Sequence, residues 1–349
     1  IISIILFLDS FSFRVLVMYR MEEAPSKYFF LTCCNVVFTI VANYYFVYIL
    51  KMGVLGALYS TLFGSLIIFL LSFPYILRKI NIQYYSISIL KKLLRFGLPF
   101  LPAVLFQMII DFSDRIILSK LMGLSAVGTY SAGYKVAGII MLLISGFRLG
   151  WEPFFLKLEK HDNRFIILSK VATFLILFLI FIMFFFLLFV ESILQYNIFG
   201  MSLLGQSYWD AISIIPIIMV GYIFLGFYYL HMPGIYYYEK TYFLPVFKGC
   251  AAISNILLNI ILIPSFGIIG AAYATTISFV IMYISVYFYS NRLFKMYIDW
   301  KIIISYLFIC IFIALLINIY NIGLLFSFII LIISCIMPLK YYFNTRITI

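Results

Sequence analysis

Residues 94–123 read LRFGLPFLPAVLFQMIIDFSDRIILSKLMG, a stretch that is mostly apolar and long enough to cross a bilayer. It nevertheless carries Asp111, Asp114 and Arg115 well inside the apolar run. A charged residue in hydrocarbon costs roughly 2.5–3.5 kcal/mol on insertion scales, so it usually faces a partner or a water-filled cavity. Asp111 and Arg115 are four positions apart, and we expect their side chains to pair on one helix face. Two prolines near the start of the stretch predict a kink, as in a helix that moves.

The composition of the whole chain is that of a membrane protein. Of its 349 residues, 66% are hydrophobic and only 10% are charged, whereas ordinary domains are about a quarter charged. The apolar runs are continuous rather than alternating, which favours helices over a β-barrel. The five cysteines lack metal-ligand spacing. The sequence therefore predicts an all-α, polytopic membrane protein, with no metal site and no cofactor.

Eleven apolar segments are candidate membrane spans. They cover residues 1–19, 27–50, 54–77, 96–121, 127–155, 165–190, 211–230, 242–263, 267–289, 302–319 and 322–339.

The basic residues divide the connections between these spans into two alternating sets. One set, together with the C-terminal tail, holds 16 of the 24 Lys and Arg residues, and the other holds only Lys51 and Lys120. By the positive-inside rule the first set is cytoplasmic, and so is the C-terminus. The net charge of +12 thus reflects orientation in membrane lipids, and we expect no nucleic-acid partner. Eleven spans place residue 1 outside, so we expect an N-terminal truncation, with an odd number of spans missing.

An internal repeat links two distant spans. Residues 53–61 read GVLGALYST and residues 267–275 read GIIGAAYAT, with five identities at one offset of 214 positions. Two unrelated packing faces rich in small residues would be the simplest interpretation. However, a Tyr-Phe pair opens each preceding span at the same offset, which favours a duplication. Six spans separate the copies, so the repeat predicts two like-oriented lobes of six helices, with three helices of the first lobe missing.

This repeat and the basic stretch before residue 96 define the expected domains. We expect the second half of an N-terminal six-helix lobe at 1–77, a cytoplasmic linker with an amphipathic surface helix at 78–95, a C-terminal six-helix lobe at 96–290, and two extra helices with a tail at 291–349.

Charged residues within the spans are the candidate site. With spans centred near 108 and 141, Arg115 and Lys135 each lie about 9–10 Å toward the outer side. Lys135 has no acidic residue three or four positions away, whereas Arg148 has Glu152 four residues on. A cationic, water-accessible cavity would attract a phosphate or pyrophosphate, although the paired charges also fit internal ion pairs that lock the fold. The candidate cavity residues are Arg115, Lys135, Arg148, Asp111, Asp114, Arg14, Glu152 and Lys248.

Several of these segments resemble a known family. The run FGLPFLP at 96–102, the run DFSDRIILSKLMGLSAVGTYSAGYKVAGI at 111–139 and Trp151-Glu152-Pro153-Phe154 resemble the start of the second lobe of Wzx-type polysaccharide repeat-unit flippases. These flippases belong to the multidrug/oligosaccharidyl-lipid/polysaccharide exporter superfamily. The segment Arg20–Tyr28, followed by Gly53 and Gly56, is similar to the first lobe of that family.

The resemblance implies a two-lobed transporter of twelve to fourteen spans, of which about eleven are present, in a bacterial cytoplasmic membrane. Its substrate would be an oligosaccharide repeat unit on undecaprenyl pyrophosphate, flipped by alternating access through the cationic cavity. The product would feed O-antigen, capsule or exopolysaccharide synthesis, and other polysaccharide assembly proteins are potential partners. Ser113-Asp114-Arg115 matches the family pattern. Coupling to a proton or sodium gradient stays open.

Three other functions are alternatives to this one. A lipid II flippase of the same superfamily is poorly distinguished by sequence. A drug/cation antiporter would favour an acidic cavity, whereas basic residues dominate here. A polysaccharide polymerase-type membrane enzyme would require a large extracytoplasmic loop or an intramembrane catalytic histidine, and neither is evident, so we expect no enzyme.

Overall fold

The computed structural model describes residues 1–79, 85–195, 197–198, 201–202, 204–319, 336, 340 and 341. Over these residues the fold is all-α, as predicted, apart from two antiparallel two-residue strands, β1 (Asn197–Ile198) and β2 (Met201–Ser202). Nine helical stretches in the described part are long and apolar enough to cross a membrane. The chain divides into two compact units, Ile1–Ile89 and Leu90–Ile349. This boundary falls inside the predicted linker, while the assignment of lobes stays a prediction.

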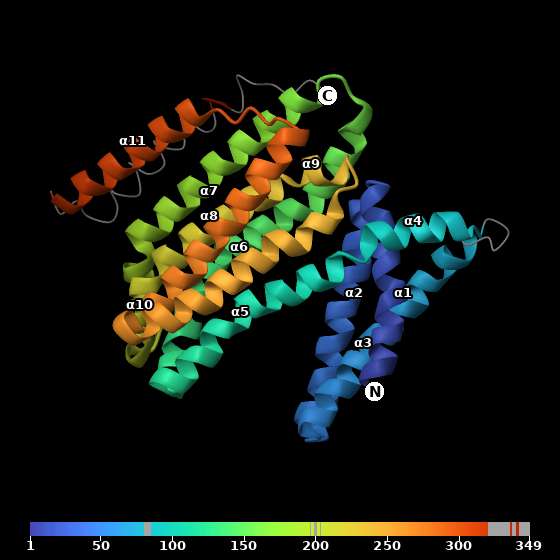
Figure 1. Cartoon of the computed structure of the whole chain (residues 1–349). Helices are drawn as coiled ribbons and strands as arrows, with labels where there is room; N and C mark the ends of the chain where they lie inside the picture. The colour runs from blue at the N-terminus through green and yellow to red at the C-terminus, as the bar shows by residue number, and fades with distance from the viewer. Residues whose placement is uncertain are drawn as a thin grey trace. The chain divides into compact units, whose positions relative to one another are not determined.

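The first unit consists of three long helices (Figure 1). They are α1 (Ile2–Met21), α2 (Pro25–Asn43) with its π-helical extension η1 (Tyr44–Ile49), and α3 (Gly53–Lys79). Helix α3 packs against both α1 and α2, and Val15, Leu31 and Ile68 form a small core between them. Most other large apolar side chains of this unit are exposed. This is the pattern of helices whose solvent is lipid, where apolar surface needs no burial in protein.

The second unit holds the larger core. Its elements are α4 (Ile87–Gly97, which begins at the boundary), α5 (Phe100–Met122), α6 (Leu124–Lys157), η3 (Leu158–Lys160), α7 (Arg164–Gln195), η4 (Gln206–Ile214), α8 (Ile215–Leu230), α9 (Met232–Tyr236), η5 (Thr241–Phe243), α10 (Leu244–Leu293) and α11 (Trp300–Ile319). Helix α5 lies along α10, and α8 packs against α6, α7 and α10 (Figure 1). Ile110, Tyr130 and Phe279 are fully buried among these helices.

Helix α10 is two antiparallel helices joined at Gly267. This glycine has φ 58° and ψ −134°, which is outside helical geometry. Asn255 Nδ2 donates a hydrogen bond to Thr275 Oγ1 at 3.5 Å. Twenty residues of straight helix would hold these side chains about 30 Å apart, so the chain reverses between them. The two predicted spans at 242–263 and 267–289 are therefore both present within α10.

The two copies of the sequence repeat share one backbone form. Gly53 has φ +56° and Gly267 has φ +58°, a region that favours glycine. Three residues on, a Cβ atom at Gly56 would lie 2.9 Å from the carbonyl oxygen of Phe46, and one at Gly270 would collide with the carbonyl of Leu262. At both places the matched glycines therefore allow a helix to reverse and return close against the preceding backbone.

The kink predicted for the span at 96–121 is wrong. Pro99 is the N-cap of α5 and Pro102 lies in its first turn, where a backbone N–H has no helical partner to lose. The chain breaks before this helix, between α4 and α5. The prolines therefore start α5 instead of bending it.

The predicted spans agree with the described helices. Every span predicted up to residue 319 coincides with one of the long helices or with half of α10. The eleventh span, predicted at 322–339, falls almost wholly outside the described residues.

Candidate functional site

Arg115, on α5, is held by groups on two helices. Its Nη1 donates to the backbone carbonyl of Asp111 and lies 3.4 Å from Asp114 Oδ1. Its guanidinium carbon is 4.4 Å from the ring centre of Tyr134 and 5.8 Å from that of Tyr130, both on α6. The guanidinium is thus oriented by one carboxylate and one aromatic face, an arrangement that suits arginine more than lysine. A quarter of the side chain stays exposed (25%).

Asp114 is fully buried and is the group that compensates Arg115. It accepts the phenolic O–H of Tyr130 at 2.6 Å and the backbone N–H of Arg115 at 2.6 Å. A buried carboxylate needs such partners because its desolvation is otherwise too costly. We therefore interpret Asp114 as a positioning residue that holds the guanidinium.

The predicted pairing of the Asp111 and Arg115 side chains is wrong. The Asp111 carboxylate instead accepts a hydrogen bond from Gln107 Nε2 at 3.1 Å, and only the backbone carbonyl of Asp111 receives the guanidinium. The physical reason is Tyr130, which fixes the Asp114 carboxylate beside the guanidinium. Helical spacing alone could not reveal this contact from the neighbouring helix.

A second charged group lies on the same helix as Tyr134. Arg148 Nε is 3.7 Å from Glu152 Oε1, so the predicted pair is present. Arg148 Nη1 also donates to the Tyr229 hydroxyl of α8 at 3.0 Å, and its guanidinium lies 4.9 Å from that ring. Arg148 and Glu152 are 42% and 35% exposed, which leaves the pair accessible to an anion.

Lys248, on α10, is a third cation close enough to be repelled by Arg148 and attracted by Asp111. It is partly buried, with Nζ 5.8 Å from the ring centre of Tyr228. We call Arg115, Lys248 and Arg148, which belong to α5, α10 and α6, the cationic track.

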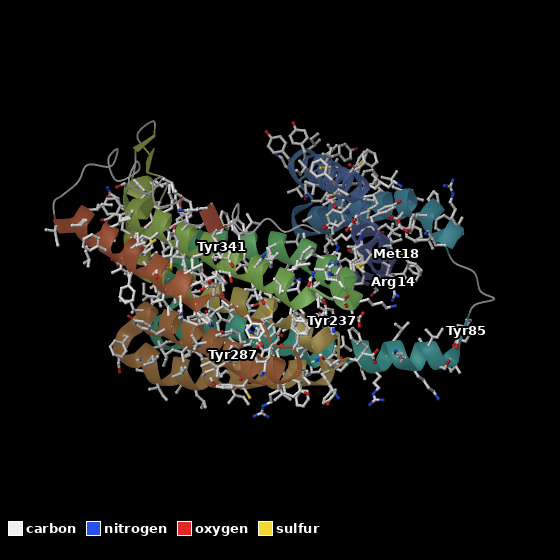
Figure 2. All side chains as sticks on the ribbon, turned by 90° about the horizontal axis from the view of Figure 1, so that it is seen from above. Arg14, Met18, Tyr85, Tyr237, Tyr287 and Tyr341 are labelled. Carbon is white, nitrogen blue, oxygen red and sulfur yellow. The ribbon has the colours of Figure 1, made fainter. Side chains whose placement is uncertain are left out.

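Lys135 and Arg14 are placed apart from this network. The Lys135 side chain is exposed on α6, directly after Tyr134, and it forms no ion pair with any described residue. Arg14 is exposed on α1 in the first unit (Figure 2), where it lines a pocket of about 410 Å³ with Tyr75 and Lys79. That Arg14 shares a cavity with Arg115 stays a prediction.

Buried amides behind the site were missed by the sequence analysis. Ser113 Oγ donates to Asn255 Oδ1 at 2.5 Å, and Asn259 Nδ2 donates to the same oxygen at 2.9 Å. Both asparagines are fully buried. Polar side chains on apolar helices signal such contacts in general, and Asn255 and Asn259, four residues apart, could have been singled out. The aromatic partners Tyr130, Tyr134 and Tyr229 carried no such signal in a chain with 29 tyrosines.

The described residues contain no group of three or more His, Cys, Asp or Glu side chains able to hold a metal ion. The arrangement is instead a set of fixed cations beside hydrogen-bonding tyrosines. Chemically, such a set binds an anion with several oxygens.

The chain matches one protein family and is similar in fold to solved structures of membrane transporters. The family described as "Polysaccharide biosynthesis protein" matches residues 1–202. Among curated proteins, no sequence matches. Three solved structures with similar folds are an outward-facing multidrug resistance MATE family transporter of the MOP superfamily, the lipid II flippase MurJ in an inward closed conformation, and a MOP superfamily transporter from Pyrococcus furiosus.

The structural likeness is broad although the sequences are distant. The TM-scores are 0.68, 0.61 and 0.60, and the sequence identities are 18%, 18% and 17%. The matches cover 82%, 98% and 77% of this chain, but only 66%, 72% and 64% of those chains. The chain thus has the fold of these membrane transporters and spans about two thirds of their length.

Proposed function

Because the chain belongs to the polysaccharide biosynthesis protein family and has the MOP superfamily fold, we propose that it is a flippase for lipid-linked oligosaccharides. Its substrate is an oligosaccharide repeat unit on undecaprenyl pyrophosphate, moved across the bacterial cytoplasmic membrane for surface polysaccharide synthesis. The family match over residues 1–202 is the observation that carries this proposal.

The cationic track gives the proposal a mechanism. A diphosphate presents several anionic oxygens, and Arg115 offers a planar fork already oriented by Asp114 and Tyr134. Lys248 and Arg148 offer further cations along the second unit, and exposed Lys135 adds a charge that no described residue neutralises. Alternating access of the two lobes then carries the bound diphosphate from one side to the other, with no chemical step.

A lipid II flippase is the second candidate. It is favoured by the fold match to MurJ, which covers 98% of this chain. Lipid II and polysaccharide intermediates share a polyisoprenyl diphosphate, so the cationic track fits both. A drug/cation antiporter fits the chain less well, because basic side chains outnumber acidic ones among the candidate cavity residues.

Export in cells tests the proposal. The full-length gene is expressed in its host after deletion of the chromosomal copy, and surface polysaccharide is quantified for wild type, Arg115→Glu and Lys135→Glu. We expect each reversal to abolish export while lipid-linked intermediates accumulate. Lys120→Glu, an exposed change at the far end of α5, is the matched control and keeps export.

Two outcomes contradict the proposal or redirect it. Normal export by Arg115→Glu would exclude the cationic track as the substrate path, and normal export by Lys135→Glu would exclude a contribution from Lys135. Unchanged polysaccharide in the deletion strain, combined with rescue of cells depleted of their lipid II flippase, would assign the chain to peptidoglycan synthesis instead.

A further inference from the structure

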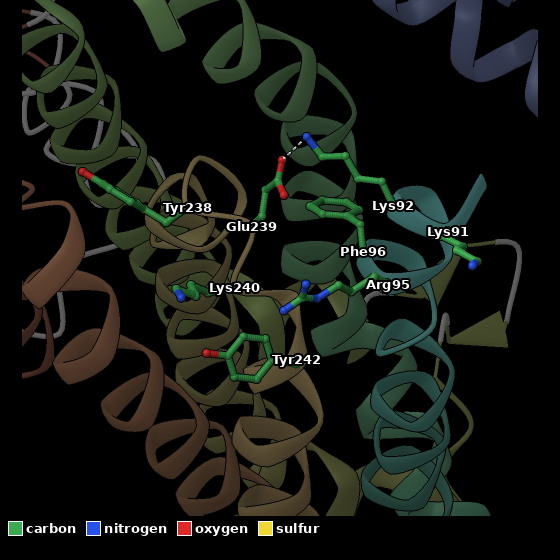
Figure 3. A pocket seen from close by; sticks show the side chains of 8 residues that line it. All are labelled: Lys91, Lys92, Arg95, Phe96, Tyr238, Glu239, Lys240 and Tyr242. Carbon is green, nitrogen blue, oxygen red and sulfur yellow. Dashed lines mark ion pairs between the residues drawn. The ribbon is translucent and has the colours of Figure 1, made fainter. Parts of the chain in front are cut away.

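A basic pocket of about 730 Å³ lies beside α4 (Figure 3), and none of the three residues of the cationic track lines it. One wall is α4, and the other is the turn from α9 to η5 together with Tyr242 of η5. The lining residues are Lys91, Lys92, Arg95, Phe96, Tyr238, Glu239, Lys240 and Tyr242. Four of them are cations and one is an anion, so the pocket has a net positive charge.

The two walls are tied together, so the pocket is a built feature of the second unit. Thr241 Oγ1 donates to the carbonyl of Phe96 at 2.8 Å. Lys92 Nζ and Glu239 Oε1 form an ion pair of 2.9 Å at the rim. Figure 3 shows Arg95 extending toward the opposite wall, where Lys240 lies, while Lys91 points away from the pocket.

The ion pair uses the only acidic residue that lines the pocket. Arg95 and Lys240 have no ion-pair partner among the described residues. A site with two cations that lack an ion-pair partner in the described part of the chain suits a phosphate group, for which arginine supplies paired donors.

The distribution of apolar and basic residues on helix α4 indicates which kind of molecule carries that phosphate group. At 100° per residue, its apolar residues Ile89, Leu90 and Leu93 fall on one side and its basic residues fall together on the opposite side. These apolar side chains are exposed, at 58%, 38% and 62%. A helix with an exposed apolar face and a basic face lies in the interface of a membrane, where its cations meet lipid headgroups. The membrane-crossing helix α5 begins only three residues after α4 ends, which puts the pocket at headgroup level.

We propose that this pocket binds the phosphate group of an anionic membrane lipid. Arg95 and Lys240 hold the phosphate, the Lys92–Glu239 pair closes the rim, and the apolar face of α4 lies among the acyl chains of the same leaflet. The site goes beyond the proposed transport function and does not depend on it. An ordinary anionic phospholipid and a polyisoprenyl diphosphate share the required chemistry, and the experiment distinguishes these two sources.

Lipid binding to the purified full chain tests the site. Native mass spectrometry gives apparent dissociation constants for phosphatidylglycerol, phosphatidylcholine and undecaprenyl diphosphate. One cation near an anionic surface contributes about 1 kcal/mol, so we expect Arg95→Gln and Lys240→Gln each to weaken phosphatidylglycerol binding about fivefold. The double variant should lose more than tenfold, and Arg95→Lys, which keeps the charge but loses the paired donors, should bind with an affinity between those of wild type and Arg95→Gln.

Lys295→Gln is the matched control, because Lys295 is exposed, lies on the same predicted side of the membrane and is outside the pocket. It should bind as wild type does. Unfolding temperatures of all variants verify folding, and the single variants suffice if the double variant is unstable. Selective loss of undecaprenyl diphosphate binding would identify the substrate lipid as the phosphate source. Equal binding of phosphatidylcholine, or no effect of Arg95→Gln and Lys240→Gln on either anionic lipid, would overturn the proposal.

Discussion

At the scale of single residues, the site depends on one buried carboxylate. Asp114 is fully buried and keeps its place through Tyr130 and Arg115. The sequence showed that these charges were unusual in an apolar helix, because their cost in hydrocarbon is independent of the fold. It could not show that Tyr130, sixteen residues later, selects Asp114 over Asp111 as the partner, since this depends on how α5 and α6 pack.

Removing one hydroxyl tests this arrangement. Tyr130→Phe leaves the Asp114 carboxylate buried without its phenolic donor. We expect it to lower the free energy of unfolding by about 1.5–3 kcal/mol, the range for hydrogen bonds to charged groups. Tyr208→Phe, at an exposed tyrosine, should change it little. Equal unfolding temperatures of both variants and wild type in detergent would contradict the role of Tyr130.

A pH effect is expected at the first unit. The Tyr75 hydroxyl donates to the Glu22 carboxylate at 2.7 Å and Lys79 lies 3.1 Å away. These contacts hold the pKa of Glu22 below its ordinary value of 4.5. A carboxylate with a lowered pKa stabilises the fold above its unfolded pKa, and this contribution disappears as the pH falls through the folded value.

Glu22→Gln should therefore lower the unfolding temperature at pH 7 and have no effect at a pH well below 4.5. Scans of wild type and variant from pH 7 to pH 3 measure the difference. Glu159→Gln, at an exposed residue, serves as the control. A difference between Glu22→Gln and wild type that grows toward acid pH would contradict the assignment.

At the scale of elements, hydropathy predicted most of the architecture. Long apolar segments must form helices in a membrane because their backbone groups have no other partners. The boundaries between segments were predicted less well. The prolines were expected to kink α5, but their position relative to the helix start was not evident from apolar periodicity. The repeat was detected as matched glycines, yet only the structure shows that Gly53 and Gly267 both reverse the chain.

Alanine substitutions test the reversal at Gly267. Its φ and ψ are costly for any residue with a Cβ, so Gly267→Ala should destabilise the protein by about 1–3 kcal/mol. Gly270→Ala should destabilise it as well, because its Cβ would meet the Leu262 carbonyl. Gly138→Ala, at a helical position where an added Cβ would have no atom within 4 Å, should be neutral or stabilising by up to about 1 kcal/mol. Similar unfolding temperatures for all three variants would contradict the conclusion that Gly267 and Gly270 are needed for the chain reversal.

At the scale of the whole molecule, binding of a diphosphate in a cavity requires water to reach the cationic residues. Position 135 provides the test, because Lys135 is exposed on α6 in the second unit. In a full-length chain with its native cysteines replaced by alanine, Lys135→Cys should react with a membrane-impermeant maleimide. Phe308→Cys, on the exposed apolar surface of α11, should stay unlabelled in lipid. Equal protection of the two positions would mean that residue 135 faces lipid.

Sequence patterns predict the topology of the whole molecule but not the choice of substrate. Composition and the positive-inside pattern predict a multi-pass protein and an orientation. The family match establishes a member of the polysaccharide biosynthesis protein family, and the likeness to solved structures shows a fold shared with membrane transporters. A preference for a particular sugar depends on shape and hydrogen bonding in three dimensions, and no local sequence pattern encodes it.

The most direct test of the central claim is the binding of a lipid diphosphate to the full-length protein. Dissociation constants are compared for undecaprenyl diphosphate and undecaprenyl monophosphate, in wild type, Arg115→Gln, Lys135→Gln and the control Lys120→Gln. The account predicts a preference for the diphosphate that falls at least tenfold in Arg115→Gln, as expected from losing a charge-assisted contact of about 1.5–3 kcal/mol, and is kept in Lys120→Gln. Equal affinity for both lipids, unchanged by Arg115→Gln and Lys135→Gln, would contradict it.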